Sequence, residues 1–232
     1  MVTRMERLFG RPKEKIRRNA PITSLAFVSV DLELTGLNEK RDAIVSIGAV
    51  KMTGGRILLS DFFYRLINPN IPFRGPSVTI HGITPSDVHA SDGMETVVRE
   101  FIDFCGDDVI IGHCVEIDMA FLGRDIRKLT GRRFRNKSVD TLSVYKWLLS
   151  RNYYNMDNTL TKNSSLYEIA KYFSIPVEIS HNAIMDAYIT AQLFQRFIPA
   201  LQCCGSQQIG DLLRIGNPSK GGVIVSGEFS NF

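Results

Sequence analysis

Short runs of apolar residues near the start of the chain predict β-strands. Residues 25–32, LAFVSVDL, are rich in Val and Phe and are short, which is typical of a buried strand. Residues 43–51 and 56–67 predict two more strands, and Gly54 and Gly55 between them indicate a hairpin turn. The chain is therefore expected to open with a three-stranded meander.

Helical spacing of apolar residues dominates the rest of the chain. A loop rich in Pro and Gly is expected first, at residues 68–86, and a short buried strand is expected at 109–112. The expected helices are 93–104, 117–129, 141–149, 165–173 and 183–197. Strands that are followed by alternating strands and helices predict an α/β fold with a mixed sheet covered by helices.

Both ends of the chain differ from the middle. Residues 1–20 hold seven Lys or Arg side chains against two Glu, so the basic excess of the chain, +4 overall, lies there. Residues 201–232 resemble loops around one short apolar run. We expect a basic arm at 1–24, one folded domain at 25–200, and a tail or partner-binding extension at 201–232. The arm either contacts phosphates or an acidic partner, or is a solvated tail.

Composition sets further limits. With 44% apolar and 22% charged residues, the chain is an ordinary globular protein in composition. No two of its four cysteines have the two-residue gap of a zinc knuckle or a redox pair, so we expect reduced thiols. No apolar run approaches the length of a membrane span. The expected location is the cytoplasm, without contact to a membrane.

The first strand ends in two carboxylates, Asp31 and Glu33. Strand side chains alternate between faces, so residues two apart point to the same side. The carboxyl end of a strand is where α/β sheets place their sites, and two like charges after an apolar strand favour a bound cation. The alternative is that both side chains simply reach solvent.

Two more carboxylates and a histidine follow in separate segments. Asp118 is expected in the first turn of a helix, where the helix dipole alone could explain it. Asp186 lies among apolar residues of the last predicted helix. Five helical positions would turn His181 about 140° away from Asp186, so both reach one centre only if His181 precedes the helix.

Four carboxylates could hold a pair of hard divalent cations, Mg²⁺ or Mn²⁺, of the kind used in phosphoryl chemistry. A neutral His181 could take the proton of an attacking water near pH 7. The residues therefore suffice for metal-assisted hydrolysis of a phosphodiester.

The segments DLELTGL, GHCVEIDMAFL and HNAIMDA resemble the three motifs of the DEDDh exonuclease superfamily, and HGIT and VDTL resemble segments of its epsilon-like branch. The resemblance covers residues 25–197. It implies a ribonuclease H-like fold with a central mixed sheet of five strands flanked by helices. It also implies an enzyme that hydrolyses single-stranded DNA or RNA from a free 3' end, and that works as a DNA polymerase subunit or as a homodimer.

The resemblance also implies roles for individual residues. The metal ligands would be Asp31, Glu33, Asp118 and Asp186, with Glu33 and His181 in catalysis and His181 as the general base. The terminal nucleotide would lie against Leu34, Thr35 and Leu37. His81 either approaches this nucleotide or orders the HGIT turn.

Two departures from the family pattern affect these expectations. Cys114 and Ile117 replace an Asn and an aromatic residue that are frequent in the second motif, and Leu34 makes the first motif resemble oligoribonuclease. DNA proofreading or repair is favoured, and RNA trimming is the alternative. A polymerase-associated binding module and another ribonuclease H-like enzyme are rival interpretations. Trp147, Tyr145, Tyr153 and Tyr154 either stack on bases or belong to the core.

Overall fold

The computed structural model describes residues 16–71, 76–154, 165–177 and 181–218. Five strands form one sheet in the order β3-β2-β1-β4-β5. The strands are β1 (Ala26–Leu34), β2 (Ile44–Thr53), β3 (Arg56–Leu66), β4 (Val109–Gly112) and β5 (Ser138–Asp140). β1 pairs antiparallel with β2 and parallel with β4, so the sheet is mixed, as predicted.

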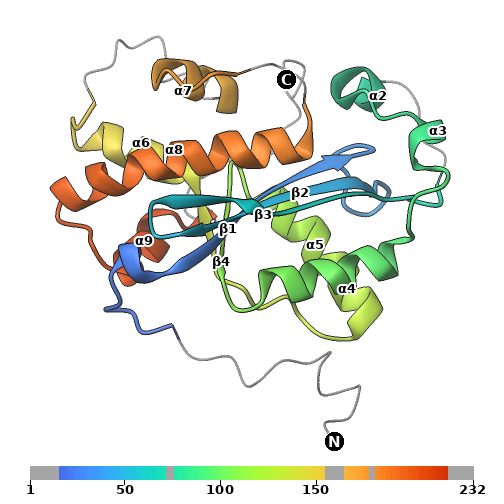
Figure 1. Ribbon diagram of the computed structural model, residues 1–232, viewed down its shortest axis with the longest axis horizontal. Coiled ribbons are helices and arrows are strands. Elements are labelled where there is room, and N and C mark those ends of the chain that lie inside the picture. Colours follow the sequence, from blue (N-terminus) through green and yellow to red (C-terminus); the bar gives the residue numbers. More distant parts are fainter. Residues whose placement is uncertain (1–15, 72–75, 155–164, 178–180, 219–232) are drawn as a thin grey trace, which may run out of the picture.

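Helices cover both faces of the sheet (Figure 1). One face carries α4 (Met94–Cys105) and α5 (Glu116–Thr130), and the other carries α6 (Thr141–Ser150), α7 (Leu166–Tyr172) and α8 (Ala183–Cys203). Alternate residues of β1 supply both cores: Phe27 packs with α8, whereas Val28 and Val30 pack with α4 and α5. The expected α/β fold with a five-stranded mixed sheet is confirmed.

The predicted loop at 68–86 is wrong in part, because it contains two short helices. These are α2 (Pro76–His81) and α3 (Pro85–Val88). Thr84 and Asp87 form a reciprocal capping box at the start of α3. Pro85 occupies the first helical position, where its missing N–H removes no hydrogen bond. Proline here begins a helix, although the sequence interpretation took it as a sign of a loop.

The expected tail at 201–232 is also wrong over its first part. Residues 201–203 continue α8, and α9 (Ile209–Ile215) packs its Ile209, Leu212 and Ile215 against the core. A further short helix, η1 (Ile22–Ser24), belongs to the predicted arm. Its Ile22 is fully buried and donates its backbone N–H to Gln207 O over 2.9 Å. The described ends of the chain therefore pack together against the domain.

Two other predictions concern cysteines and membranes. None of the four cysteines forms a disulfide bond. Within the described ranges, no helix has the length and apolar character needed to cross a bilayer.

Candidate active site

The carboxylates of Asp31 and Glu33 lie on the face of β1 that α8 covers. Ser29, two residues before Asp31, donates its hydroxyl to the carbonyl of Ala187 in α8 over 2.8 Å. Because alternate strand residues share a face, Asp31 and Glu33 follow Ser29 along the same side. Both residues belong to β1 itself, which extends two residues beyond its predicted end.

Gly48 allows the start of α8 to approach this pair. In the register of β1 and β2, Gly48 is directly opposite Asp31. A Cβ atom at Gly48 would lie 2.1 Å from the carbonyl carbon of Ala183, the first residue of α8. The missing side chain therefore lets the first turn of α8, with Asp186, pack against the strands.

The result is a compact group of three carboxylates. Ligand atoms of Asp31, Glu33 and Asp186 all lie within 4.8 Å of one another. Asp118, in the first turn of α5, is outside that group but is buried, and its charge raises the pKa of both Asp31 and Glu33. All four predicted ligands thus lie close together, with three in a tighter cluster.

Burial raises the pKa of all four carboxyl groups, and repulsion from the neighbouring carboxylates adds to the shift at Asp31 and Glu33. Burial is the largest cause for each. The pKa of Asp31 lies well above its ordinary value, that of Glu33 is about 9 and that of Asp118 about 8. The pKa of Asp186 is also raised, although a hydrogen bond from Tyr167 and the charge of His181 oppose the shift. Such a cluster of hard oxygen donors fits a divalent cation, which would offset the repulsion.

His181 precedes α8, as the sequence predicted, because α8 begins at Ala183. Its backbone has a φ of 41°, which is uncommon for a residue other than glycine. Its backbone N–H donates to the hydroxyl of Tyr167 over 3.2 Å, and the Tyr167 ring lies edge-on to the imidazole with centroids 5.2 Å apart. The imidazole is partly exposed.

Tyr167 was not expected in the site. Its hydroxyl lies 2.9 and 2.8 Å from the two carboxylate oxygens of Asp186. No signal in the sequence marks this contact, because the two residues belong to different helices. Gly48 did carry a signal, since an isolated glycine within a strand pattern indicates close backbone approach.

The predicted nucleotide-binding loop follows β1 directly. Leu34 ends the strand, and Leu37 is 49% exposed. Thr35 donates its hydroxyl to Asp42 over 3.3 Å. Arg124 of α5 donates to the carbonyl of Asp42 over 2.8 Å and so ties this loop to the helix that carries Asp118. Leu37 is therefore an exposed apolar residue on an anchored loop that directly follows the strand with Asp31 and Glu33.

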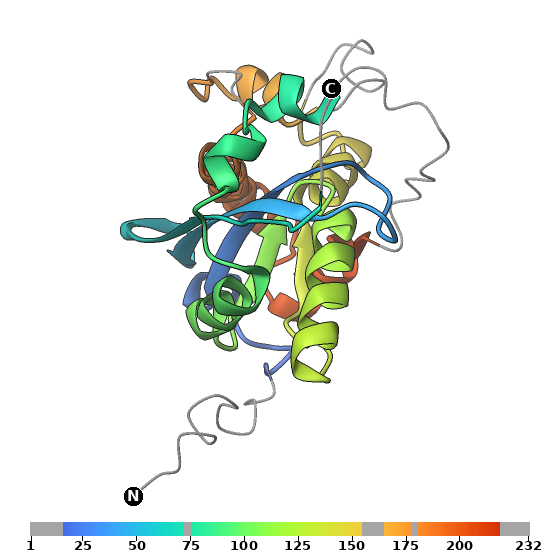
Figure 2. The same ribbon diagram turned by 90° about the vertical axis from the view of Figure 1, so that its right-hand side faces the viewer.

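His81 ends α2 close to the same loop. Its Nδ1 accepts the backbone N–H of Ile83 over 3.0 Å, so the imidazole orders the turn of HGIT. Burial lowers the pKa of His81, a backbone contact with Leu34 raises it, and the charge of His181 lowers it. Figure 2 shows α2 and α3 beside the near end of α8. The Nε2 of His81 is buried, and the backbone of Leu34 lies beside the ring.

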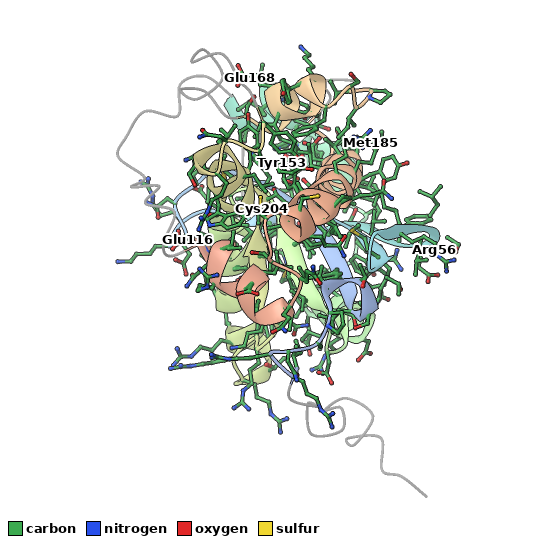
Figure 3. All side chains as sticks on the ribbon, turned by 90° about the vertical axis from the view of Figure 1, so that its left-hand side faces the viewer. Arg56, Glu116, Tyr153, Glu168, Met185 and Cys204 are labelled. Atoms are coloured by element: carbon green, nitrogen blue, oxygen red, sulfur yellow. The ribbon has the colours of Figure 1, made fainter. Side chains whose placement is uncertain are left out.

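The aromatic side chains of α6 and the following turn belong mainly to the core. Tyr145 is fully buried and stacks on Phe197, with ring centroids 6.2 Å apart. Tyr154 packs edge-on against Phe173 at 4.9 Å. Tyr153, which is 39% exposed, lies near the carboxyl end of α8, where Cys204 is also labelled (Figure 3). These contacts favour the core interpretation over base stacking.

The second motif departs from the family pattern at Cys114, and the structure gives this position a specific backbone shape. Cys114 has a φ of 56°, a region that Asn adopts more readily than other non-glycine residues. Its backbone N–H donates to the carboxylate of Asp140 over 2.8 Å. Asp140 also caps α6 by accepting from Leu142 and Ser143. The VDTL segment thus holds the loop that leads into α5 and Asp118.

Sequence comparison identifies the family. Residues 28–194 match the family model described as exonuclease, RNase_T, which covers every residue of the carboxylate site and His181. The chain belongs to this exonuclease family. The expected membership of the DEDDh, or DnaQ-like, 3'–5' exonuclease superfamily is confirmed.

Several relatives are proteins of bacterial DNA polymerase III. The chain is 32% identical over 177 residues to the epsilon subunit of Aquifex aeolicus, a match that covers 75% of this chain and 81% of the subunit. It is 32% identical to the PolC-type DNA polymerase III of Thermotoga maritima over 82% of this chain, but that match spans only 13% of the polymerase. A match to an epsilon-like protein of Rhodobacter capsulatus, also 32% identical, spans 28% of that protein.

Solved structures share the fold at lower identity. A zinc-bound complex of E. coli ExoI with single-stranded DNA superposes with a TM-score of 0.65 at 18% identity, over 78% of this chain and 42% of that chain. Exonuclease X in complex with 5'-overhanging duplex DNA superposes with a TM-score of 0.56 at 21% identity, over 82% and 99%. These likenesses support the ribonuclease H-like fold.

Proposed function

We propose that this chain is a divalent-metal-dependent exonuclease that removes nucleotides one at a time from the 3' end of nucleic acid. The observation that carries the proposal is the convergence of Asp31, Glu33 and Asp186 within 4.8 Å, with buried Asp118 beside them, in a member of an exonuclease family. Buried like charges at this spacing are unfavourable unless a cation joins them.

Asp31, Glu33, Asp118 and Asp186 would hold two Mg²⁺ or Mn²⁺ ions, because these ions prefer carboxylate and water oxygens. When bound, such ions would lower the pKa of a coordinated water and stabilise charge on the leaving oxygen. With such ions bound, the four carboxylates would also set where the scissile phosphate lies relative to the loop after β1.

His181 would act as the general base. Its imidazole is partly exposed, and its charge interacts with Asp186 and His81, so it borders both the carboxylates and the loop. As the water oxygen bonds to phosphorus, its proton passes to the neutral imidazole, and the bond to the 3' oxygen breaks. The products are a nucleoside 5'-monophosphate and a strand with a new 3'-hydroxyl, whose proton comes from solvent.

The terminal nucleotide would lie against Leu34, Thr35 and Leu37. Leu37 is the exposed apolar side chain of this loop, which suits contact with a base. His81 would order the HGIT turn beside this loop, because its Nδ1 accepts the Ile83 N–H and its Nε2 is buried.

DNA is the favoured substrate, because the relatives described above are DNA polymerase III proteins and both structural neighbours are complexes with DNA. RNA trimming remains the second candidate, since Leu34 gives the first motif an oligoribonuclease-like sequence. The partner would be a strand with a free 3' end, and a DNA polymerase subunit or a second copy of this chain would be the protein partner. The third candidate is a polymerase-associated module with residual activity.

The test is product analysis with 5'-labelled single-stranded DNA and RNA of the same sequence, in Mg²⁺, Mn²⁺ or chelator. We expect a ladder of labelled products that shortens from the 3' end with either ion and is absent with chelator. The faster ladder identifies the preferred sugar. Labelled mononucleotide as the first product would indicate attack from the 5' end and would contradict the proposal, and intact strands throughout would favour the binding module.

A further inference from the structure

The hydroxyl group of Tyr167 contacts both Asp186, in the first turn of α8, and His181, just before this helix. The O–H of Tyr167 points at the Asp186 carboxylate, with 2.9 and 2.8 Å to its two oxygens. The same hydroxyl oxygen accepts the backbone N–H of His181 over 3.2 Å. Donation to one residue and acceptance from the other use both kinds of hydrogen-bonding capacity that a phenol has.

We propose that Tyr167 is a positioning residue, which fixes the Asp186 carboxylate and the His181 backbone relative to each other. This inference rests on the proposed function, because it assigns Tyr167 a role toward a proposed metal ligand and a proposed base. Tyr167 would act through Asp186 and His181 and not on the substrate directly.

Asp186 benefits from the contact because a buried carboxylate needs donors to hold one orientation. Its side chain is only 5% exposed, and its neighbours Asp31 and Glu33 offer negative charge. A single donor nearly equidistant from the two oxygens restricts rotation of the carboxylate about its last bond. Hydrogen bonds of this kind orient metal ligands and strongly affect how well they bind.

His181 benefits because its backbone conformation is unusual. A φ of 41° is sparsely populated for residues with a side chain and persists only where neighbouring contacts enforce it. The N–H bond to Tyr167 and the edge-on ring contact at 5.2 Å both act on this residue. Together they hold the imidazole where its charge acts on Asp186.

Tyr167 is itself held in place by the start of α7. Ser165 and Glu168 form a reciprocal capping box around this turn, with Ser165 N donating to Glu168 Oε2 over 3.2 Å. The neighbouring Leu166 and Ile169 are buried in the core. Glu168 in α7 and Met185 in the first turn of α8 lie at the same end of the molecule (Figure 3). A capped and anchored turn therefore presents the hydroxyl.

The test compares Tyr167→Phe with Tyr172→Phe. Tyr167→Phe deletes the hydroxyl and keeps the ring. Tyr172→Phe makes the same change on the same helix at a residue that is 40% exposed and lies outside the Asp186–His181 contact. Mn²⁺ binding is measured in the absence of nucleic acid by calorimetry and by the electron paramagnetic resonance of free Mn²⁺. Initial rates on a 5'-labelled DNA strand then separate kcat from KM.

We expect Tyr167→Phe to bind Mn²⁺ about tenfold more weakly and to lose about tenfold in kcat at saturating Mn²⁺, with KM for DNA unchanged. Tyr172→Phe should match the wild type in all three quantities. Equal Mn²⁺ affinity and equal kcat in folded Tyr167→Phe would overturn the proposal, as would equal losses in both variants. If the wild type cleaves no nucleic acid, the proposed function fails, while the Mn²⁺ measurement still decides whether Tyr167 positions Asp186.

Discussion

The crowded carboxylates should destabilise the folded chain at neutral pH when no cation is bound, and Glu33→Gln should relieve part of this. The pKa of Glu33 is raised from 4.5 to about 9 by burial, then by Asp186 and Asp118. A carboxyl with a raised pKa in the folded state binds its proton more tightly there than in the unfolded chain. Glu33 therefore costs the folded state no stability below pH 4.5, and this cost grows as the pH rises from 4.5 toward 9.

The magnitude follows from this shift. Each pH unit between the two pKa values costs roughly 1.4 kcal/mol, so the interval from pH 4.5 to pH 7 costs up to about 3.5 kcal/mol. Glutamine resembles protonated Glu33 in shape and charge. The variant should therefore match the wild type near pH 4.5 and exceed its free energy of unfolding by up to about 3.5 kcal/mol at pH 7.

Urea denaturation in the presence of chelator, at a series of pH values from 4.5 to 8.5, measures this difference. Adding Mn²⁺ at about 100 times its Kd should then stabilise the wild type by roughly 2.7 kcal/mol and the variant by less, since Glu33 is a proposed ligand. A difference between wild type and variant that is the same at pH 4.5 and pH 7 would refute the reasoning. A variant less stable than the wild type at pH 7 would refute it as well.

Two substitutions test how the site is assembled. Gly48→Ala should push α8 away from the strands, because the new Cβ would lie 2.1 Å from the carbonyl carbon of Ala183. We expect kcat to fall by about tenfold or more, measured by initial rates, and the free energy of unfolding to fall by roughly 1–3 kcal/mol, measured by urea denaturation. Gly123→Ala in α5 is the matched control, since its Cβ meets nothing within 4 Å, and an equal loss there would contradict the argument. His181→Ala should lose about 10²-fold in rate. An unchanged pH–rate profile in that variant would remove His181 from the mechanism.

Local pattern was sufficient to predict the elements that carry the motifs. The apolar run before Asp31 predicted β1, and the two-residue spacing predicted that Glu33 shares its face. The helical angle between His181 and Asp186 required a loop at His181, and α8 does begin after it. These predictions succeeded because each depends on backbone geometry within a few residues.

Features that depend on distant contacts could not be predicted in this way. β5 has only three residues, Ser138–Asp140, too few for an alternation pattern to be read. α9 looked like a tail because its apolar residues lie among loop-like sequences, and only packing against the core reveals them as part of the domain. The bond between Tyr167 and Asp186 joins two helices, so spacing along the chain gave no indication of it.

The most direct test of the account is a time course of wild type and Asp31→Ala on one 5'-labelled DNA strand in the same Mn²⁺ buffer. Circular dichroism should first show that both proteins are folded. We predict progressive shortening from the 3' end by the wild type and no shortening by Asp31→Ala, because Asp31 lies in the carboxylate cluster proposed to hold the metal ions. Near-normal shortening by Asp31→Ala would contradict the account, since hydrolysis would then not depend on this centre.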